Sequence, residues 1–136
     1  MRYFLDTEFI ESGPAKPIQL ISIGIVSEDG RKLYCISKEF NPVDASEWVR
    51  TNILEQLESY IPRLSLLEIK RELLKFVTEK PEFWGYYADY DWVVFCQIFG
   101  AMIDLPKGWP MYCRDLKQWS DEIGAPKLEA PKGEHN

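Results

Sequence analysis

The sequence predicts an α/β domain whose mixed sheet is flanked by helices. Three strand-like segments come first along the 136 residues, and helical segments then alternate with shorter strands. The first three strands should form an antiparallel meander, and strand–helix–strand units should add parallel neighbours. No linker, repeat or low-complexity tract interrupts the chain, so residues 1–136 are expected to form a single domain with its own core.

The meander is indicated by β-branched runs and by the turns that separate them. A first strand begins over residues 2–5, and a loop rich in glycine and proline (13–17) leads to a second strand at 18–26. Residues 28–31 contain an Asp-Gly turn signal. The segment 32–40 should therefore return antiparallel to the second strand as a hairpin.

Helical signals begin after the meander. Asp44 is expected to cap the N-terminus of a short helix that runs through Val49. A clearer helix opens at Ser65 with the spacing of a capping box, and Pro81 ends that segment. The pattern is completed by two further helices and two short strands: 91–99, 115–123, 82–87 and 111–113.

Two carboxylates follow the apolar start of the first strand. Side chains at i and i+2 of a strand share a face, so Asp6 and Glu8 should lie roughly 7 Å apart. Such a pair loses hydration and repels itself unless a cation lies between the two groups. Carboxylate oxygens suit Mg²⁺ or Mn²⁺, which indicates a metal site. The alternative is a strand that ends at Leu5, followed by a solvated acidic turn.

A third acid and the single histidine extend this pattern. Asp91 lies where the strand at 82–87 meets the next helix. One interpretation is structural: Asp91 favours the helix dipole, with Asp89 as the N-cap. The other is that Asp91 projects toward a metal held by the first strand, because such residues converge at strand ends in α/β sheets. His135 is a candidate general base, since histidine titrates near neutral pH.

Composition limits the classes of function. A net charge of −6 argues against a broad basic surface for nucleic acid, but it suits an acidic cluster whose bound metal inverts the local field. Cys35, Cys96 and Cys113 are far apart, which predicts free thiols rather than a disulfide framework or a zinc site. No signal-peptide pattern and no long apolar run are present, so a cytoplasmic protein without a membrane partner is expected.

The ordered motifs resemble those of DEDDh 3′–5′ exonucleases, in the DnaQ-like branch of the RNase H-like fold. The shared features are Asp6-x-Glu8 on the first strand, Tyr90-Asp91 at a strand-to-helix junction and His135 near the C-terminal end. The chain is most similar to the RNase AS type of bacterial and phage exoribonuclease. Four segments carry this closer resemblance, which covers essentially the whole chain: 3–11 (YFLDTEFIE), 20–24 (LISIG), 48–51 (WVRT) and 90–97 (YDWVVFCQ).

The resemblance implies hydrolysis with two Mg²⁺ or Mn²⁺ ions about 3.5–4 Å apart. Asp6 would bridge both ions, Glu8 would hold the ion that carries the attacking water, and Asp91 would hold the ion at the leaving 3′ oxygen. His135 would accept the proton from the water. Nucleoside 5′-monophosphates would then leave single-stranded RNA from its 3′ end. The RNase AS type further suggests adenylate-rich 3′ tails as substrate, and a homodimer.

Substrate contacts are also implied by the resemblance. Thr7 and Phe9, with Ile10 as a further candidate, are expected to pack on the terminal nucleotide. Base stacking on an aromatic ring contributes roughly 1–3 kcal/mol and needs no basic surface. Trp48 and Arg50 resemble the region that touches the next nucleotide. The alternative for this segment is a core position for Trp48 and a solvated Arg50.

The pattern departs from the resemblance at its end. The fourth acid of the family follows the histidine by five residues, whereas this sequence stops at Asn136. We therefore expect the C-terminal helix to be missing, with truncation favoured over a natural short form. The 136-residue form should be impaired, and equal activity of a chain extended through the missing acid would contradict this.

Two alternatives to an exoribonuclease remain at this point. The first is a DNA exonuclease or oligonucleotide trimmer, which differs in its contact to the 2′-hydroxyl. The second is a catalytically inactive RNase H-like module for binding or dimerisation, which the absent fourth acid supports.

Overall fold

A six-stranded mixed sheet forms the centre of the computed structural model, which describes residues 1–78 and 80–124. The strands lie in the order β4-β3-β2-β1-β5-β6, so β1 is central. The antiparallel part is the expected meander: β1 (Arg2–Ile10), β2 (Gln19–Ser27) and β3 (Lys32–Ser37). Three short strands extend the sheet by parallel pairing: β4 (Arg63–Leu64), β5 (Glu82–Gly85) and β6 (Arg114–Asp115).

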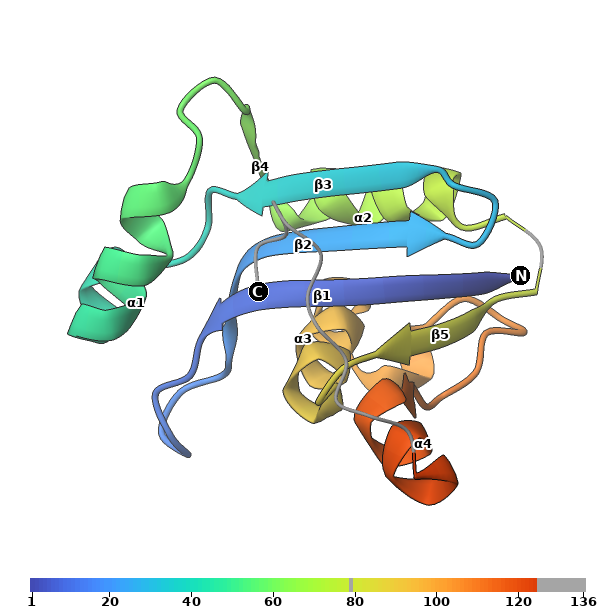
Figure 1. Cartoon of the computed structure of the whole chain (residues 1–136). Coiled ribbons are helices and arrows are strands. Elements are labelled where there is room, and N and C mark those ends of the chain that lie inside the picture. The colour runs from blue at the N-terminus through green and yellow to red at the C-terminus, as the bar shows by residue number, and fades with distance from the viewer. Residues whose placement is uncertain (79, 125–136) are drawn as a thin grey trace.

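Four α-helices in the described part flank this sheet, which confirms the predicted α/β class and is consistent with an RNase H-like fold. They are α1 (Glu47–Asn52), α2 (Leu66–Phe76), α3 (Asp89–Phe99) and α4 (Leu116–Ile123). Three 3₁₀ segments join them: η1 (Pro42–Asp44), η2 (Leu54–Gln56) and η3 (Met102–Asp104). In Figure 1, α1 lies beyond the ends of the long strands, and α2 passes behind β2 and β3. None of the helices among these residues has the length and apolar character needed to cross a bilayer.

The main core lies between the sheet and the helices α2 and α3. Tyr3 and Leu5 of β1 pack there with Leu73 of α2 and Phe95 of α3. Along β1, buried residues alternate with half-buried ones up to Glu8. Since side chains of a strand alternate between faces, Asp6 and Glu8 lie on the face opposite this core. That face carries the candidate site.

Several predicted boundaries differ from the structure. β1 continues through the acidic pair to Ile10, so the alternative of a strand ending at Leu5 is wrong. β3 ends at Ser37 rather than at residue 40. The predicted strand at 111–113 is instead Arg114–Asp115, because pairing with β5 places it there.

Two predicted helix caps were also wrong. Asp44 does not cap α1. It lies in η1, where its carboxylate accepts hydrogen bonds from Lys16 Nζ (2.7 Å) and Gln19 Nε2 (2.9 Å). Ser46 caps α1 instead, and its hydroxyl accepts from Val49 N. Helix α3 begins at Asp89, so the N-cap is Ala88.

Candidate active site

Asp6 and Glu8 lie side by side on the central strand, as predicted. Asp6 pairs with Gly24 of β2 and Glu8 pairs with Ser22, and both acids are half-buried. The register with β2 shifts directly after Glu8, between Glu8 and Phe9. The structure therefore places the two carboxylates together on one face of β1, just before this irregularity.

Asp91 reaches the same strand at its other edge. β5 pairs with β1 only from Arg2 to Phe4 and ends at Gly85, so the following part of that edge is not covered by β5. There Asp91 Oδ1 accepts hydrogen bonds from Thr7 N (3.0 Å) and from the Thr7 hydroxyl. The residue between the two acids of β1 is therefore tied to the third acid, 84 positions away in the sequence.

The negative charges of these acids repel one another. Burial raises the pKa of Glu8 to about 7, and the negative charge of Asp91 contributes. Burial also raises the pKa of Asp91, with a contribution from Asp115, although the two Thr7 hydrogen bonds act in the opposite direction. A divalent cation would relieve this repulsion, and a set of carboxylate oxygens matches the preference of Mg²⁺ or Mn²⁺.

The described acids do not by themselves form a complete set of metal ligands. Across residues 1–78 and 80–124, no three Asp, Glu, His or Cys side chains are grouped closely enough to hold one ion. Because Thr7 donates both of its hydrogen bonds to Oδ1 of Asp91, Oδ2 is the atom of this carboxylate best placed to act as a ligand. The described residues thus supply the donor chemistry for a metal, with Asp91 restrained at the strand edge.

Thr7, Phe9 and Ile10, which were expected to contact the terminal nucleotide, have different surroundings in the structure. Thr7 is buried, and both its amide and its hydroxyl serve Asp91. The ring of Phe9 is half-buried and meets that of Tyr90 edge-on, with centroids 6.1 Å apart. Ile10 is a core residue with 1% exposure, packed with Ile21, so the prediction of a nucleotide contact there was wrong.

Helix α1 presents Trp48 to solvent. The Trp48 side chain is 66% exposed, which excludes the alternative that it is a core residue. Arg50 binds the preceding segment, donating from Nε to Pro42 O (3.2 Å) and from Nη2 to Val43 O (2.9 Å). Trp48 therefore remains available for a nucleotide contact. His135, the predicted general base, lies outside the described residues.

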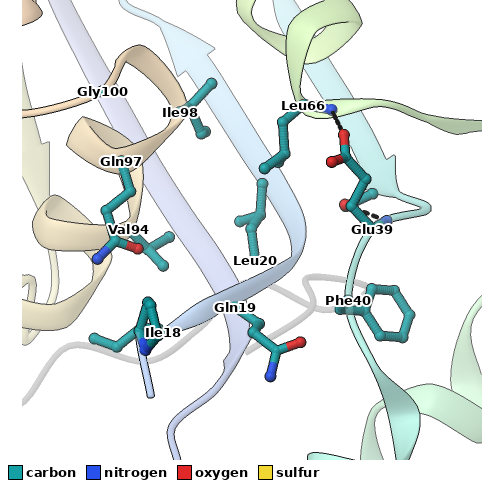
Figure 2. Close-up of a pocket in the computed structure, with 12 residues that line it drawn as sticks. Ile18, Gln19, Leu20, Glu39, Phe40, Leu66, Val94, Gln97, Ile98 and Gly100 are labelled. Atoms are coloured by element: carbon teal, nitrogen blue, oxygen red, sulfur yellow. Dashed lines mark hydrogen bonds between the residues drawn. The ribbon is translucent and has the colours of Figure 1, made fainter. Parts of the chain in front are cut away.

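A separate cavity of about 350 Å³ lies on the helix-covered side of the sheet, between α3 and the start of α2 (Figure 2). Leu20, Leu66, Val94 and Ile98 contribute apolar side chains to it. Leu66 N donates a hydrogen bond to Glu39, which satisfies a free amide at the first turn of α2. Leu20, Val94 and Ile98 also belong to the main core, so this cavity is not part of the acidic site.

Comparison with known families bears on this arrangement. The profile of the Rv2179c-like 3′–5′ exoribonuclease domain matches residues 1–132. The chain belongs to this family. The matched span includes Asp6, Glu8 and Asp91 and ends before His135, and it confirms the predicted 3′–5′ exoribonuclease relationship.

Two curated members of this exoribonuclease family come from Mycobacterium tuberculosis. They are the 3′-5′ exoribonuclease MT2234.1 of strain CDC 1551 / Oshkosh and the 3′-5′ exoribonuclease Rv2179c of strain ATCC 25618 / H37Rv. Each is 42% identical to this chain over 134 residues, covering 94% of this chain and 79% of the relative.

Sequence reasoning missed Asp115 in this Rv2179c-like domain. Its Oδ2 accepts from Ala88 N (2.9 Å) and its Oδ1 from Tyr87 N (3.4 Å), in the turn that precedes Asp91. Asp115 also caps α4 through Lys117 N (2.8 Å). Burial raises its pKa, but these backbone donors outweigh burial and lower it. The helix predicted to start at residue 115 indicated that Asp115 could be its cap. The hydrogen bonds of Asp115 to the turn before Asp91 could not be predicted in this way, because they depend on the pairing of β5 with β6.

Replacing Thr7 with valine tests whether its hydroxyl restrains Asp91. The variant keeps the shape but leaves a buried carboxylate with one donor fewer, so unfolding free energy should fall by about 1–3 kcal/mol. Thr7→Ser, which keeps the hydroxyl, should recover most of this loss. Urea unfolding in the absence of RNA and metal measures the unfolding free energy of each variant. An unchanged value for Thr7→Val would contradict the restraint.

The raised pKa of Glu8 predicts a pH-dependent stability of the metal-free protein. A protonated Glu8 stabilises the fold fully below the ordinary pKa of 4.5, and this stabilisation is lost as pH rises through about 7. Glu8→Gln cannot ionise, so in EDTA it should melt higher than the parent at pH 8 and equally near pH 4.5. Glu122→Gln, at an exposed position on α4, is the control and should follow the parent. An equal difference at both pH values would contradict the assignment.

Proposed function

We propose that this chain is a metal-dependent 3′–5′ exoribonuclease that removes nucleoside 5′-monophosphates from single-stranded RNA. The observation that carries the proposal is the hydrogen bonding of Asp91 to Thr7, which brings a third acid against the strand of Asp6 and Glu8. Membership of the Rv2179c-like exoribonuclease domain family supports the same activity. In this proposal, Asp6, Glu8 and Asp91 form the acidic part of the active site.

The proposed cofactor is Mg²⁺ or Mn²⁺, with two ions per complete site. Asp6 and Glu8 would hold the ions from β1, and Asp91 would contribute from the first turn of α3. The support is the oxygen-only donor set and the raised pKa values of Glu8 and Asp91, which arise chiefly from burial of the carboxylates, with a smaller contribution from neighbouring negative charges. When bound, such ions lower the pKa of water and neutralise charge on the phosphate.

The other residues have distinct proposed tasks. Thr7 orients Asp91, and Phe9, which contacts Tyr90, forms an aromatic surface for the terminal nucleotide. Trp48 offers an exposed ring for the next nucleotide, while Arg50 holds η1 against α1. The similarity to the RNase AS type supports His135 as the proton acceptor, adenylate-rich 3′ tails as substrate, and a homodimer.

The test is stepwise shortening of matched oligonucleotides. A 5′-labelled RNA with Mg²⁺ or Mn²⁺ should yield a ladder of products that all retain the label, and EDTA should stop the reaction. RNA that carries a blocked 3′ end should resist. Equal shortening of DNA would indicate a general exonuclease, and internal cleavage would contradict the proposal. Metal-independent RNA binding without shortening would favour the inactive module. Adenylate and uridylate tails, compared directly, test the tail preference.

A further inference from the structure

Tyr87 combines an unusual backbone conformation with an exposed ring. Among the described residues it is the single non-glycine residue with positive φ, at 52°, and its side chain is 65% exposed. Residues with a Cβ adopt this left-handed region at a free-energy cost, and such positions cluster at functional sites. Glycine or asparagine would occupy the position with less strain. Burial of the ring does not explain why tyrosine stands here.

The surrounding structure imposes the conformation of Tyr87. Asp115 accepts hydrogen bonds from the amides of both Tyr87 and Ala88. On the other side of the turn, Gly85 packs so closely that a Cβ there would lie 2.7 Å from that of Ala88 and 3.3 Å from Leu5 O. The turn between β5 and α3 is therefore held at both ends. The Tyr87 ring projects from a rigid support four residues before Asp91.

The neighbours of Tyr87 suit a nucleotide. The ring of Tyr86 meets that of Tyr87 edge-on, with centroids 4.8 Å apart. The amides of Tyr87 (3.4 Å) and Lys117 (2.8 Å) both donate to Asp115 Oδ1, so Lys117, in the first turn of α4, lies beside this turn. Its ammonium pairs with Asp121. Tyr90 is 51% exposed at the start of the helix that carries Asp91. Aromatic faces beside a cation are the combination that binds a base and its phosphate in single-stranded nucleic acid.

We propose that Tyr87 is a stacking platform for a base of the RNA strand upstream of the nucleotide that is removed. This inference rests on the proposed function and adds a contact to the same site. Asp115 acts as a positioning residue, because it fixes the backbone from which the ring projects. Lys117, whose amide shares the Asp115 carboxylate with that of Tyr87, would supply the cation for the phosphate of the stacked nucleotide.

The matched variants separate the ring from the strain. Tyr87→Gly adopts positive φ without steric cost, so it removes the ring and preserves the turn. Tyr87→Asn is a second variant that tolerates this conformation, and Tyr87→Phe retains the ring. Ile103→Ala removes an exposed apolar side chain, 76% exposed, beyond the opposite end of α3 and is the control.

Affinity for a fluorescent single-stranded RNA 12-mer, measured by anisotropy in EDTA, gives a direct readout without hydrolysis. Loss of one stacked base should weaken binding by Tyr87→Gly and Tyr87→Asn roughly 5- to 100-fold, with melting temperatures close to the parent. Tyr87→Phe and Ile103→Ala should bind like the parent. Parent-like RNA affinity of the Gly and Asn variants would overturn the platform while leaving the exoribonuclease proposal intact. A parent that neither binds nor shortens RNA would overturn both.

Discussion

Replacement of Asp91 by asparagine is expected to slow RNA hydrolysis severely while leaving the fold as stable as the parent, or more stable. Asparagine keeps an oxygen that accepts the two hydrogen bonds from Thr7. It removes a charge whose burial raises the pKa of the carboxyl, so the penalty for desolvating that charge disappears. The same change removes a proposed metal ligand. Function and stability should therefore change in opposite directions.

The size of the activity loss follows from the proposed metal chemistry. A metal ion supplies several kcal/mol of charge stabilisation, and each 1.4 kcal/mol or so is tenfold in rate. We expect kcat/KM for RNA shortening to fall roughly 10²- to 10⁴-fold, with thermal unfolding as the parallel measurement. Asp89→Asn is the matched control, because Asp89 is exposed on the same first turn of α3 and should keep activity within a few-fold. Activity of Asp91→Asn within tenfold of the parent would contradict its role.

The substitution Gly85→Ala, which adds one methyl group, is expected to reduce stability and activity together. The new Cβ would lie 2.7 Å from Ala88 Cβ and 3.3 Å from Leu5 O, and both neighbours belong to or are fixed by the backbone. The turn would have to move away from β1. Since Ala88 is the N-cap of α3, this movement would draw Asp91 away from Thr7. Overpacking of this kind costs typically 1–3 kcal/mol.

Gly24→Ala is the matched control for the stability effect. Gly24 lies within β2, and a Cβ there would find its nearest neighbour, Tyr34 Cδ1, at 3.8 Å, which is ordinary contact. Denaturant unfolding should show a change within about 1 kcal/mol for Gly24→Ala and a larger loss for Gly85→Ala. RNA shortening by Gly85→Ala should be impaired even well below its melting temperature. Equal stability of the two variants would contradict the close approach.

Much of the fold was predictable where the signal is local. The capping box at Ser65 and Glu68 forms as expected, because its partners are three residues apart. The Asp-Gly turn joins β2 to β3, and Gly100 ends α3. The cap of α1 was predicted at Asp44, whereas Ser46 forms it. Either side chain can cap a helix, and the choice depends on the bonds of Asp44 to Lys16 and Gln19.

In the candidate site, too, local features were predictable and long-range contacts were not. The spacing of Asp6 and Glu8 alone determined that two acids share a face of one strand, because alternation along a strand is a property of the backbone. Only the tertiary structure decided that Asp91 is bonded to Thr7 and that Asp115 holds the turn before it. These contacts depend on where β5 leaves the edge of β1 and on how β6 pairs with β5. Residues so far apart in the chain meet through strand pairing, which a local pattern does not specify.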